Sequence, residues 1–132
     1  MTEILVSPDV LPAATTYLRS GLGALAGRVG TEVPATMPNN VVKVSLTGGS
    51  RADIVSDSAQ LTVECWSVNA PTASLLARTA HAYMLAAAGV TAGGLFVRKV
   101  DTVGGVQDFP DPDTNSPRYQ FTVRWHVRPA AI

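Results

Sequence analysis

Cysteine, charged residues and long apolar runs are all scarce in this chain of 132 residues. Its one cysteine, Cys65, excludes an intrachain disulfide and a cysteine-based zinc finger. Ten basic residues balance ten acidic ones and form no run, so the basic footprint of a sequence-reading nucleic-acid binder is missing. The most apolar helix candidate, residues 80–90, is too short to span a membrane, and the first residues lack the basic segment of a signal peptide. We therefore expect a soluble protein that is made in the cytosol.

The low charge also bears on self-association. Charged residues make up 15% of the chain, against about a quarter in an average protein, and the zero net charge leaves little repulsion between copies. An oligomer and a small monomer rich in alanine and valine explain this composition equally well. Hydrophobic residues, at 46%, are sufficient for a packed core. The length suits one domain, residues 1–132.

Periodicity and turn signals predict two helices and four strands. The first helix begins at Val10, after the capping segment 7–9, and ends before Arg28. The second begins at the Asn69 cap and ends at Gly89. The predicted strands are 41–47, 60–68, 95–103 and 119–128, and glycine pairs at 48–49 and 104–105 are expected to stop the first and third. This order predicts an α+β fold with a four-stranded, mainly antiparallel sheet packed by two helices.

The last predicted strand alternates almost perfectly between apolar and polar residues, which indicates one buried face. On that face, Phe121, Val123 and Trp125 are expected to pack against the second helix. The predicted contacts on the helix are Leu76, Ala80 and Tyr83.

One segment has the beginning of a calcium-binding loop. Asp111, Asp113 and Asn115 have the spacing at which alternate side chains converge on one cation. Ser116 stands where the sharp-turn glycine is needed and Thr122 where the bidentate glutamate is needed, so a proline-braced loop is favoured over a calcium site. We predict no metal and no cofactor.

The residue types needed for nucleophilic catalysis are present but scattered. Cys65 with His81 or His126 would make a Cys/His pair if the fold joined them, yet a buried cysteine that acts as a small apolar residue is favoured. The glycine pairs never extend to a phosphate-binding motif, which favours turns and bulges at strand ends. No feature of the sequence calls for catalysis, and we expect a protein that is not an enzyme.

Residues 107–117 are the most distinctive loop. They contain three prolines together with Asp108, Asp111 and Asp113. Prolines fix the backbone and lower the entropy lost on docking, which suits an interface element. A plain hairpin connection, in which Arg118 braces the carboxylates within the chain, is the equally weighted alternative.

The order of motifs resembles the tail terminator proteins of long-tailed, siphovirus-type bacteriophages that infect actinobacteria. The resemblance covers nearly the whole chain and is most specific in the Thr-Gly-Gly turn at 47–49 followed by Arg51, the Thr-Val-Glu-Cys-Trp strand at 62–66, and the segment from Pro110-Asp111-Pro112-Asp113 to Pro117-Arg118-Tyr119. Relatives carry more arginines after the Gly-Gly turn, where this chain has Arg51 alone.

This resemblance implies a structural virion protein at the tail-neck junction, assembled in the host cytoplasm. It would form a homohexameric ring on the head-proximal end of the tail tube, stop tube polymerisation and present the joining surface for the head-completion (stopper) protein. The implied partners are other copies of the chain, the major tail tube protein, the stopper protein and the tape measure protein. Genomic DNA would pass through the lumen without sequence-specific binding, and no membrane is involved. A ring that closes uses two different patches head to tail.

The residues expected at these assembly interfaces come from the two most specific turns and loops. They are Thr47, Gly48, Gly49, Arg51, Asp108, Pro110, Asp111, Pro112, Asp113, Pro117 and Arg118. Two other functions remain open at this point. One is a neighbouring head-tail connector or neck protein, which would bind the portal rather than the tube. The other is a small α+β enzyme or ligand-binding domain that uses Cys65, His81 or His126.

Overall fold

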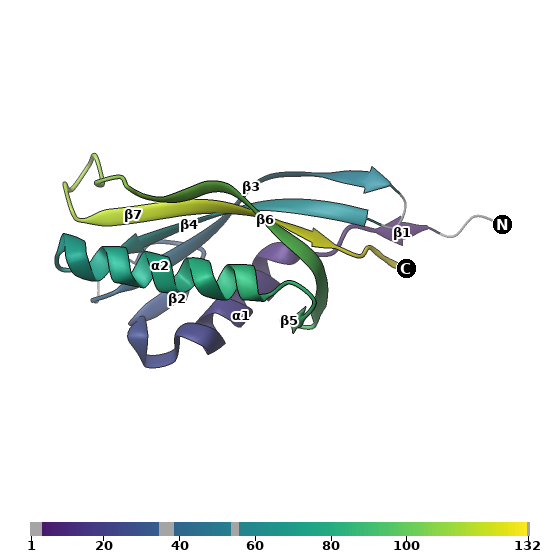
Figure 1. Cartoon of the computed structure of the whole chain (residues 1–132), viewed down its shortest axis with the longest axis horizontal. Coiled ribbons are helices and arrows are strands. Elements are labelled where there is room, and N and C mark those ends of the chain that lie inside the picture. Colours follow the sequence, from purple (N-terminus) through teal and green to yellow (C-terminus); the bar gives the residue numbers. More distant parts are fainter. Residues whose placement is uncertain (1–3, 35–38, 54–55, 132) are drawn as a thin grey trace.

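The computed structural model describes residues 4–34, 39–53 and 56–131. Two helices, α1 (Val10–Leu22) and α2 (Ala70–Ala86), lie on one side of a long twisted sheet (Figure 1), and a short 3-10 helix, η1 (Gly23–Leu25), follows α1. The strands are β1 (Leu5–Val6), β2 (Arg28–Gly30), β3 (Val41–Asp53), β4 (Ser56–Trp66), β5 (Thr91–Ala92), β6 (Leu95–Asp108), β7 (Arg118–Val127) and β8 (Ala130–Ala131). No helix in these ranges is both long and apolar enough for a membrane span.

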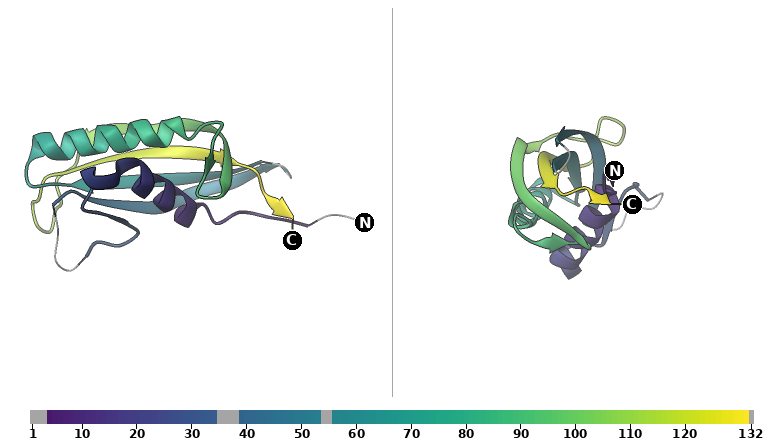
Figure 2. Two further views of the ribbon diagram at one scale, coloured as in Figure 1. Left: turned by 90° about the horizontal axis from the view of Figure 1, so that it is seen from below. Right: turned by 90° about the vertical axis from the view of Figure 1, so that its right-hand side faces the viewer.

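The sheet has six strands in the order β2-β3-β4-β7-β6-β5, so the prediction of a four-stranded antiparallel sheet is wrong. The four predicted strands form its centre, and β2 and β5 extend it at the two edges. β2 pairs parallel with β3, whereas the other neighbours are antiparallel, and the sheet curls around the helices (Figure 2). A separate pair, β1 with β8, joins the two ends of the chain.

The edge strands are short and lie in segments rich in glycine, which is why the sequence pattern missed them. β2 is held by its neighbours rather than by its own propensity. The amide of Gly27 donates to the carbonyl of Asn40 (2.8 Å), and the guanidinium of Arg19 on α1 donates to the carbonyl of Val29 (2.8 Å). Val29 is buried beneath α1 as part of the core.

The glycine pairs do not stop β3 and β6, which corrects a second prediction. Both strands continue through them to Asp53 and Asp108, and the register shifts beside Gly48 and Gly104 instead. At Gly49 the backbone has φ +149, and a Cβ there would collide with the carbonyl oxygen of Ser58. The long strands therefore have bulges beside these glycines, and the pairing continues on the far side of each bulge.

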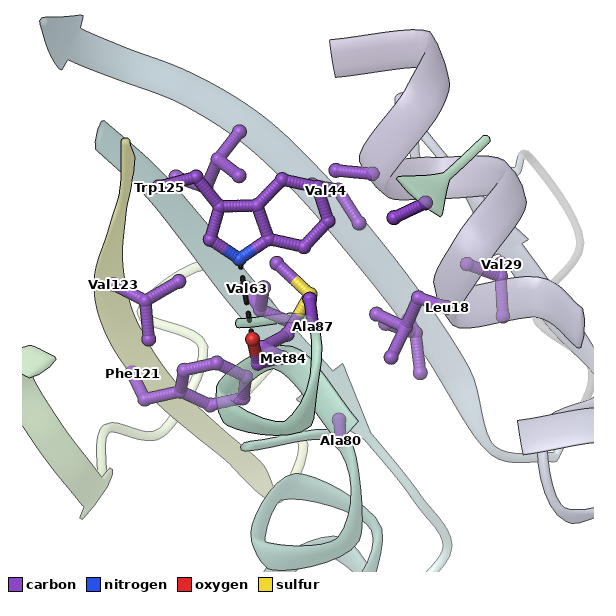
Figure 3. Packing of buried hydrophobic residues seen from close by; sticks show 14 of the residues in the cluster. Leu18, Val29, Val44, Val63, Ala80, Met84, Ala87, Phe121, Val123 and Trp125 are labelled. Atoms are coloured by element: carbon purple, nitrogen blue, oxygen red, sulfur yellow. Dashed lines mark hydrogen bonds between the residues drawn. The ribbon is translucent and has the colours of Figure 1, made fainter. Parts of the chain in front are cut away.

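The predicted packing of β7 on α2 is confirmed in most of its contacts. Phe121, Val123 and Trp125 are buried in one cluster with Leu76 and Ala80 (Figure 3). Tyr83 is the exception, because it stays 38% exposed. Met84 lies in the core in its place, and its carbonyl accepts a hydrogen bond from the Trp125 indole (3.2 Å). The Asn69 cap is also confirmed, since its side chain accepts a bond from the Thr72 amide (2.9 Å).

Candidate assembly surfaces

The loop that joins β6 to β7, residues 109–117, is a folded element with its own hydrogen bonds. We call it the proline loop. The Phe109 amide donates to the carbonyl of Arg118 (2.9 Å) at its base, and the Asp111 amide donates to the carbonyl of Ser116 (3.1 Å) further out. The Asn115 amide closes a turn onto the carbonyl of Asp111 (2.7 Å), with Asn115 itself at φ 56. The loop is therefore preorganised by its backbone as well as by its prolines.

The proline loop covers a second, smaller apolar cluster on the face of the sheet opposite the helices. Trp66 follows Cys65 on β4, and because Cys65 points into the main core, Trp66 points to the other face. Trp66 is nevertheless only 4% exposed, and its cross-strand partner Val41 is fully buried, although neither belongs to the main core cluster. This burial requires a cover that the helices do not provide.

Arg118 and Asp111 attach the loop to Trp66. The Arg118 guanidinium lies 5.6 Å from the centre of the Trp66 ring and 5.2 Å from that of Phe109, so it is sandwiched between two aromatic side chains. Its Nε donates to the carbonyl of Phe109 (2.8 Å), and its Nη1 donates to a carboxylate oxygen of Glu64 (2.9 Å). The Trp66 indole N–H in turn donates to Asp111 Oδ2 (3.2 Å). Arg118 thus braces the loop through a main-chain carbonyl, and the carboxylate it pairs with belongs to β4.

Both carboxylate oxygens of Asp111, the first residue of the calcium-loop pattern, accept hydrogen bonds from within the protein. Its Oδ1 accepts from the Asp113 amide (2.9 Å) and its Oδ2 from Trp66. These bonds, the Asp113 amide first, lower the pKa of Asp111 below its ordinary value. Within residues 4–34, 39–53 and 56–131, no group of three or more histidine, cysteine or acidic side chains is arranged to hold a metal ion.

The outward side of the proline loop is acidic and partly apolar. Asp108, Asp113 and two of the prolines are exposed, and Phe109 leaves 48% of its surface accessible. In the described part of the chain no hydrogen bond or ion pair is made by the carboxylate of Asp108 or of Asp113. The loop therefore presents two unused carboxylates on a rigid support.

The second group of predicted interface residues lies on the hairpin of β3 and β4. Thr47 belongs to a hydrogen-bonded row of threonine hydroxyls. Its Oγ1 is 3.0 Å from Oγ1 of Thr62, which in turn is 3.0 Å from Oγ1 of Thr122. Thr47 is also the residue without a register partner at the bulge, and Gly48 and Gly49 resume the pairing with β4 directly after it. The backbone of Arg51 pairs with Asp57 in the same hairpin, but the side chain of Arg51 lies outside the described residues.

The structure brings the predicted interface residues together as two groups rather than one. The hairpin and the proline loop lie at opposite ends of the sheet's long axis (Figure 1). The glycine and proline content of the sequence indicates both groups of residues. It does not indicate how far apart the groups lie, because the lengths and pairing of the strands determine that distance.

Away from Trp66 and Val41, the sheet face opposite the helices is polar, and several of its charged side chains are paired. Lys43 and Arg118 share the carboxylate of Glu64, at 4.0 and 2.9 Å. Arg124 donates to the side-chain oxygen of Gln60 (3.0 Å). His126 lies 2.8 Å from Asp101, and this hydrogen bond is the first cause of a lowered pKa at Asp101. Lys43, Arg118, Arg124 and His126 on this face therefore have partners within the protein.

Cys65 and the two histidines do not form a catalytic pair. Cys65 is fully buried in the core, and burial followed by the nearby Glu64 raises the pKa of its thiol, which disfavours the nucleophilic thiolate. His81, on α2, lies 3.0 Å from the hydroxyl of Thr102 and packs against the Phe121 ring at an angle of 59°, and partial burial lowers its pKa. His126 is on the polar face of the sheet, so it points away from Cys65.

Sequence reasoning missed a groove between α1 and β2. It has a volume of about 810 Å³ and is lined by Thr15 and Arg19 of α1, Arg28 and Val29 of β2, and residues of the connecting segment. Arg19 and Arg28 are nine positions apart on different elements, and the only local signal was a basic residue in the last turn of α1. Helix α1, which forms one wall of the groove, lies on the opposite side of the sheet from the proline loop (Figure 2).

The similarity of this chain to known proteins lies in its fold. No protein-family model matches the chain, and no curated protein matches it in sequence. Among solved structures, the fold is similar to a chain described as "Virion of native gene transfer agent (GTA) particle". That similarity has a TM-score of 0.49 and 14% sequence identity, and it covers 84% of each chain.

Proposed function

We propose that this chain is a structural virion protein of a long-tailed bacteriophage that caps the head-proximal end of the tail tube as a homohexameric ring. It acts as a single domain, stops tube polymerisation and provides the joining surface for the head-completion protein at the tail-neck junction. The major tail tube protein and the tape measure protein are its partners on the tail side.

The observation that carries this proposal is the pair of preorganised surfaces at the two ends of the sheet. A protein that joins two different structures needs two distinct contact regions, and a ring needs two patches that meet head to tail. The proline loop is fixed by the Trp66 contacts, and the hairpin is fixed by the pairing of β3 with β4, which continues through the bulge before Gly48. Both belong to the motifs that carry the resemblance to tail terminators.

The chemistry of the described side chains supports a binding role rather than catalysis. The cysteine thiol is buried with a raised pKa, and each histidine is engaged by a neighbour on a separate part of the fold. Lys43, Arg118 and Arg124 on the uncovered sheet face are also engaged within the protein, which reduces their availability for phosphate contacts. This pairing suits a ring through which genomic DNA passes without sequence-specific binding.

The test is a phage from which the gene for this chain is deleted, with the wild-type chain supplied in trans as the control. We expect tails of uncontrolled length and unjoined heads by electron microscopy, and both defects should be reversed by the wild-type chain. Tails of normal length with unjoined heads would contradict a terminator and indicate the neighbouring neck protein. Normal particles would contradict both.

A second measurement examines the oligomer directly. Purified chain added to polymerising tube protein should shorten the tubes, and averaged end-on views of the capped tubes should have sixfold symmetry at one end. Tubes that elongate equally with and without the chain would overturn the capping role.

A further inference from the structure

Helix α2 is apolar on both of its faces. Its inner face belongs to the core, where it packs against β4, β6 and β7. The residues on the opposite face are exposed and follow one another at helical spacing. We call them the outer stripe of α2: Pro71, Leu75, Arg78, Ala82, Leu85 and Ala86. Leu75 and Leu85 leave 48% and 37% of their surface accessible. A helix that is hydrophobic all round is normally a buried one, so the outer stripe has the composition of an interface.

Arg78 decides which kind of occupant fits the outer stripe. It is the one lysine, arginine, aspartate or glutamate of the helix, and it stands in the middle of the stripe. Two copies that joined their stripes about a twofold axis at this point would bring two Arg78 side chains together, and like charges oppose that contact. A pairing displaced along the helix would leave part of the stripe uncovered.

The guanidinium of Arg78 is available for a carboxylate. Its Nε donates to the hydroxyl of Ser74 (3.2 Å), and it forms no ion pair within the described residues. The planar fork of arginine suits carboxylates because it offers parallel N–H donors. An occupant that combines an unused carboxylate with apolar surface is therefore complementary to the stripe.

The proline loop has both of these properties. The carboxylate of Asp113 is exposed, and in the part of the chain that the structure describes it makes no hydrogen bond or ion pair. In the same loop, the Phe109 ring leaves 48% of its surface accessible. The loop's internal hydrogen bonds hold it in one conformation, which reduces the entropy lost on docking.

The proline loop and the outer stripe cannot meet within one molecule. Asp113 is held over the sheet face opposite the helices, because its amide donates to Asp111, which in turn accepts from the Trp66 indole. The outer stripe points away from the sheet on the helix side (Figure 2). A contact between them therefore joins two copies, and because the two surfaces differ, the contact is head to tail rather than symmetric.

We infer that the proline loop of one copy docks on the outer stripe of α2 of the next copy, with Asp113 paired to Arg78 and the Phe109 ring against the leucines of the stripe. This inference rests on the proposed ring and names the contact that builds it. The stripe is about 22 Å long and about 10 Å wide, which is roughly a quarter of the area that each partner buries in a stable complex. We therefore expect weak self-association in solution, which the ring strengthens because each copy then uses both of its patches.

Charge reversal tests the contact. Arg78→Glu and Asp113→Lys should each weaken self-association at least about tenfold, because each places like charges together. The double variant should restore it, because the pair re-forms with opposite polarity. Glu32→Lys and Arg128→Glu, which reverse exposed charges elsewhere, are the matched controls and should leave association unchanged. The measurements are analytical ultracentrifugation up to about 1 mM protein and tube capping.

Leu75→Ser tests the apolar part of the contact. It should weaken self-association by a similar factor, while the Tm of the single copy stays unchanged because the Leu75 side chain is 48% exposed. Unchanged self-association in this variant would overturn the contact between the loop and the stripe.

Cross-linking gives the geometry. Under oxidation, an Arg78→Cys chain mixed with an Asp113→Cys chain should form linked dimers, and a chain with both changes should form a ladder of covalent oligomers. Cys65 is buried and should not compete. A linked dimer of Arg78→Cys alone would indicate stripe-to-stripe pairing and overturn the inference. A ladder of the double variant that stops at dimers would overturn the head-to-tail contact.

The outcomes separate this inference from the proposed function. Charge reversals that leave self-association, tube capping and tail length intact would overturn the loop-to-stripe contact but not the capping role. Stripe variants that abolish tube capping while self-association persists would assign the stripe to the tube protein and overturn the inference. A cross-linked ring that has no effect on tube length would support the contact and contradict the capping function.

Discussion

Replacement of Trp66 by alanine tests whether the proline loop is a folded cover rather than a mobile connection. Trp66 is 4% exposed, although it lies on the sheet face that the helices do not reach. Loss of a fully buried tryptophan costs about 3–5 kcal/mol in a rigid core. The loop can partly collapse into the space, so we expect the lower end, about 3 kcal/mol. For a domain of this size, that loss corresponds to a decrease in Tm of roughly 10 °C.

Two further variants divide this loss into packing and hydrogen bonding. Trp66→Phe keeps the aromatic stack with Arg118 but removes the N–H that donates to Asp111. Asp111 is partly accessible to water, so we expect a cost of about 1 kcal/mol. Leu46→Ala, at a side chain that is 52% exposed on the same sheet, is the control and should change stability by less than about 0.5 kcal/mol.

The assay is urea unfolding followed by far-UV circular dichroism, with tryptophan fluorescence as a second probe. A loss below about 1 kcal/mol for Trp66→Ala, equal to that of the exposed control, would refute the reasoning. It would mean that the loop leaves Trp66 accessible in solution and is not preorganised.

The remaining predictions concern the core, the hairpin and the loop. Trp125→Ala should cost about 3–5 kcal/mol in urea unfolding, because the indole is fully buried and bonded to a helix carbonyl; unchanged stability would mean that the faces of β7 are reversed. Gly49→Ala should lower the free energy of unfolding by more than about 1 kcal/mol, since φ is +149 and the Cβ meets the Ser58 carbonyl; unchanged stability would mean that Gly49 does not hold this conformation in solution. The lowered pKa of Asp111 means that its contribution is complete above the unfolded pKa, about 4, and is lost as pH falls through the lower folded value. Trp66 fluorescence should therefore change on acidification below about pH 4, and Asp111→Asn should abolish that change. Thermal unfolding with calcium and with chelator should coincide, and a rise of several degrees with calcium would indicate a bound cation.

The sequence alone was sufficient for the elements whose patterns are local. The cap at Asn69 and the alternation of 119–128 predicted α2 and β7 to within a few residues, because capping and strand alternation are set by neighbours in the chain. The burial of Phe121, Val123 and Trp125 followed from the same alternation. The glycine and proline content also indicated the two candidate surfaces before their positions were known.

Tertiary structure decided the features that depend on partners distant in the chain. β2 exists as a strand because Asn40 and Arg19 hold it, and its own three residues carry no such signal. β3 and β6 continue through their glycine pairs because β4 and β7 supply hydrogen bonds on the far side of each bulge. Local propensity predicts a stop at such glycines, and pairing with a neighbouring strand overrides it.

The candidate site shows the same division. Pro110, Pro112 and Pro117 are visible in the sequence as a stiff segment, yet the contact that fixes the loop joins Trp66 to Asp111, which are 45 residues apart. The arginines of the groove are likewise on separate elements. Composition and periodicity thus determined which segments are stiff, apolar or acidic. The pairing of the strands determined which of these segments meet, because only long-range pairing sets the side of the sheet on which each segment lies.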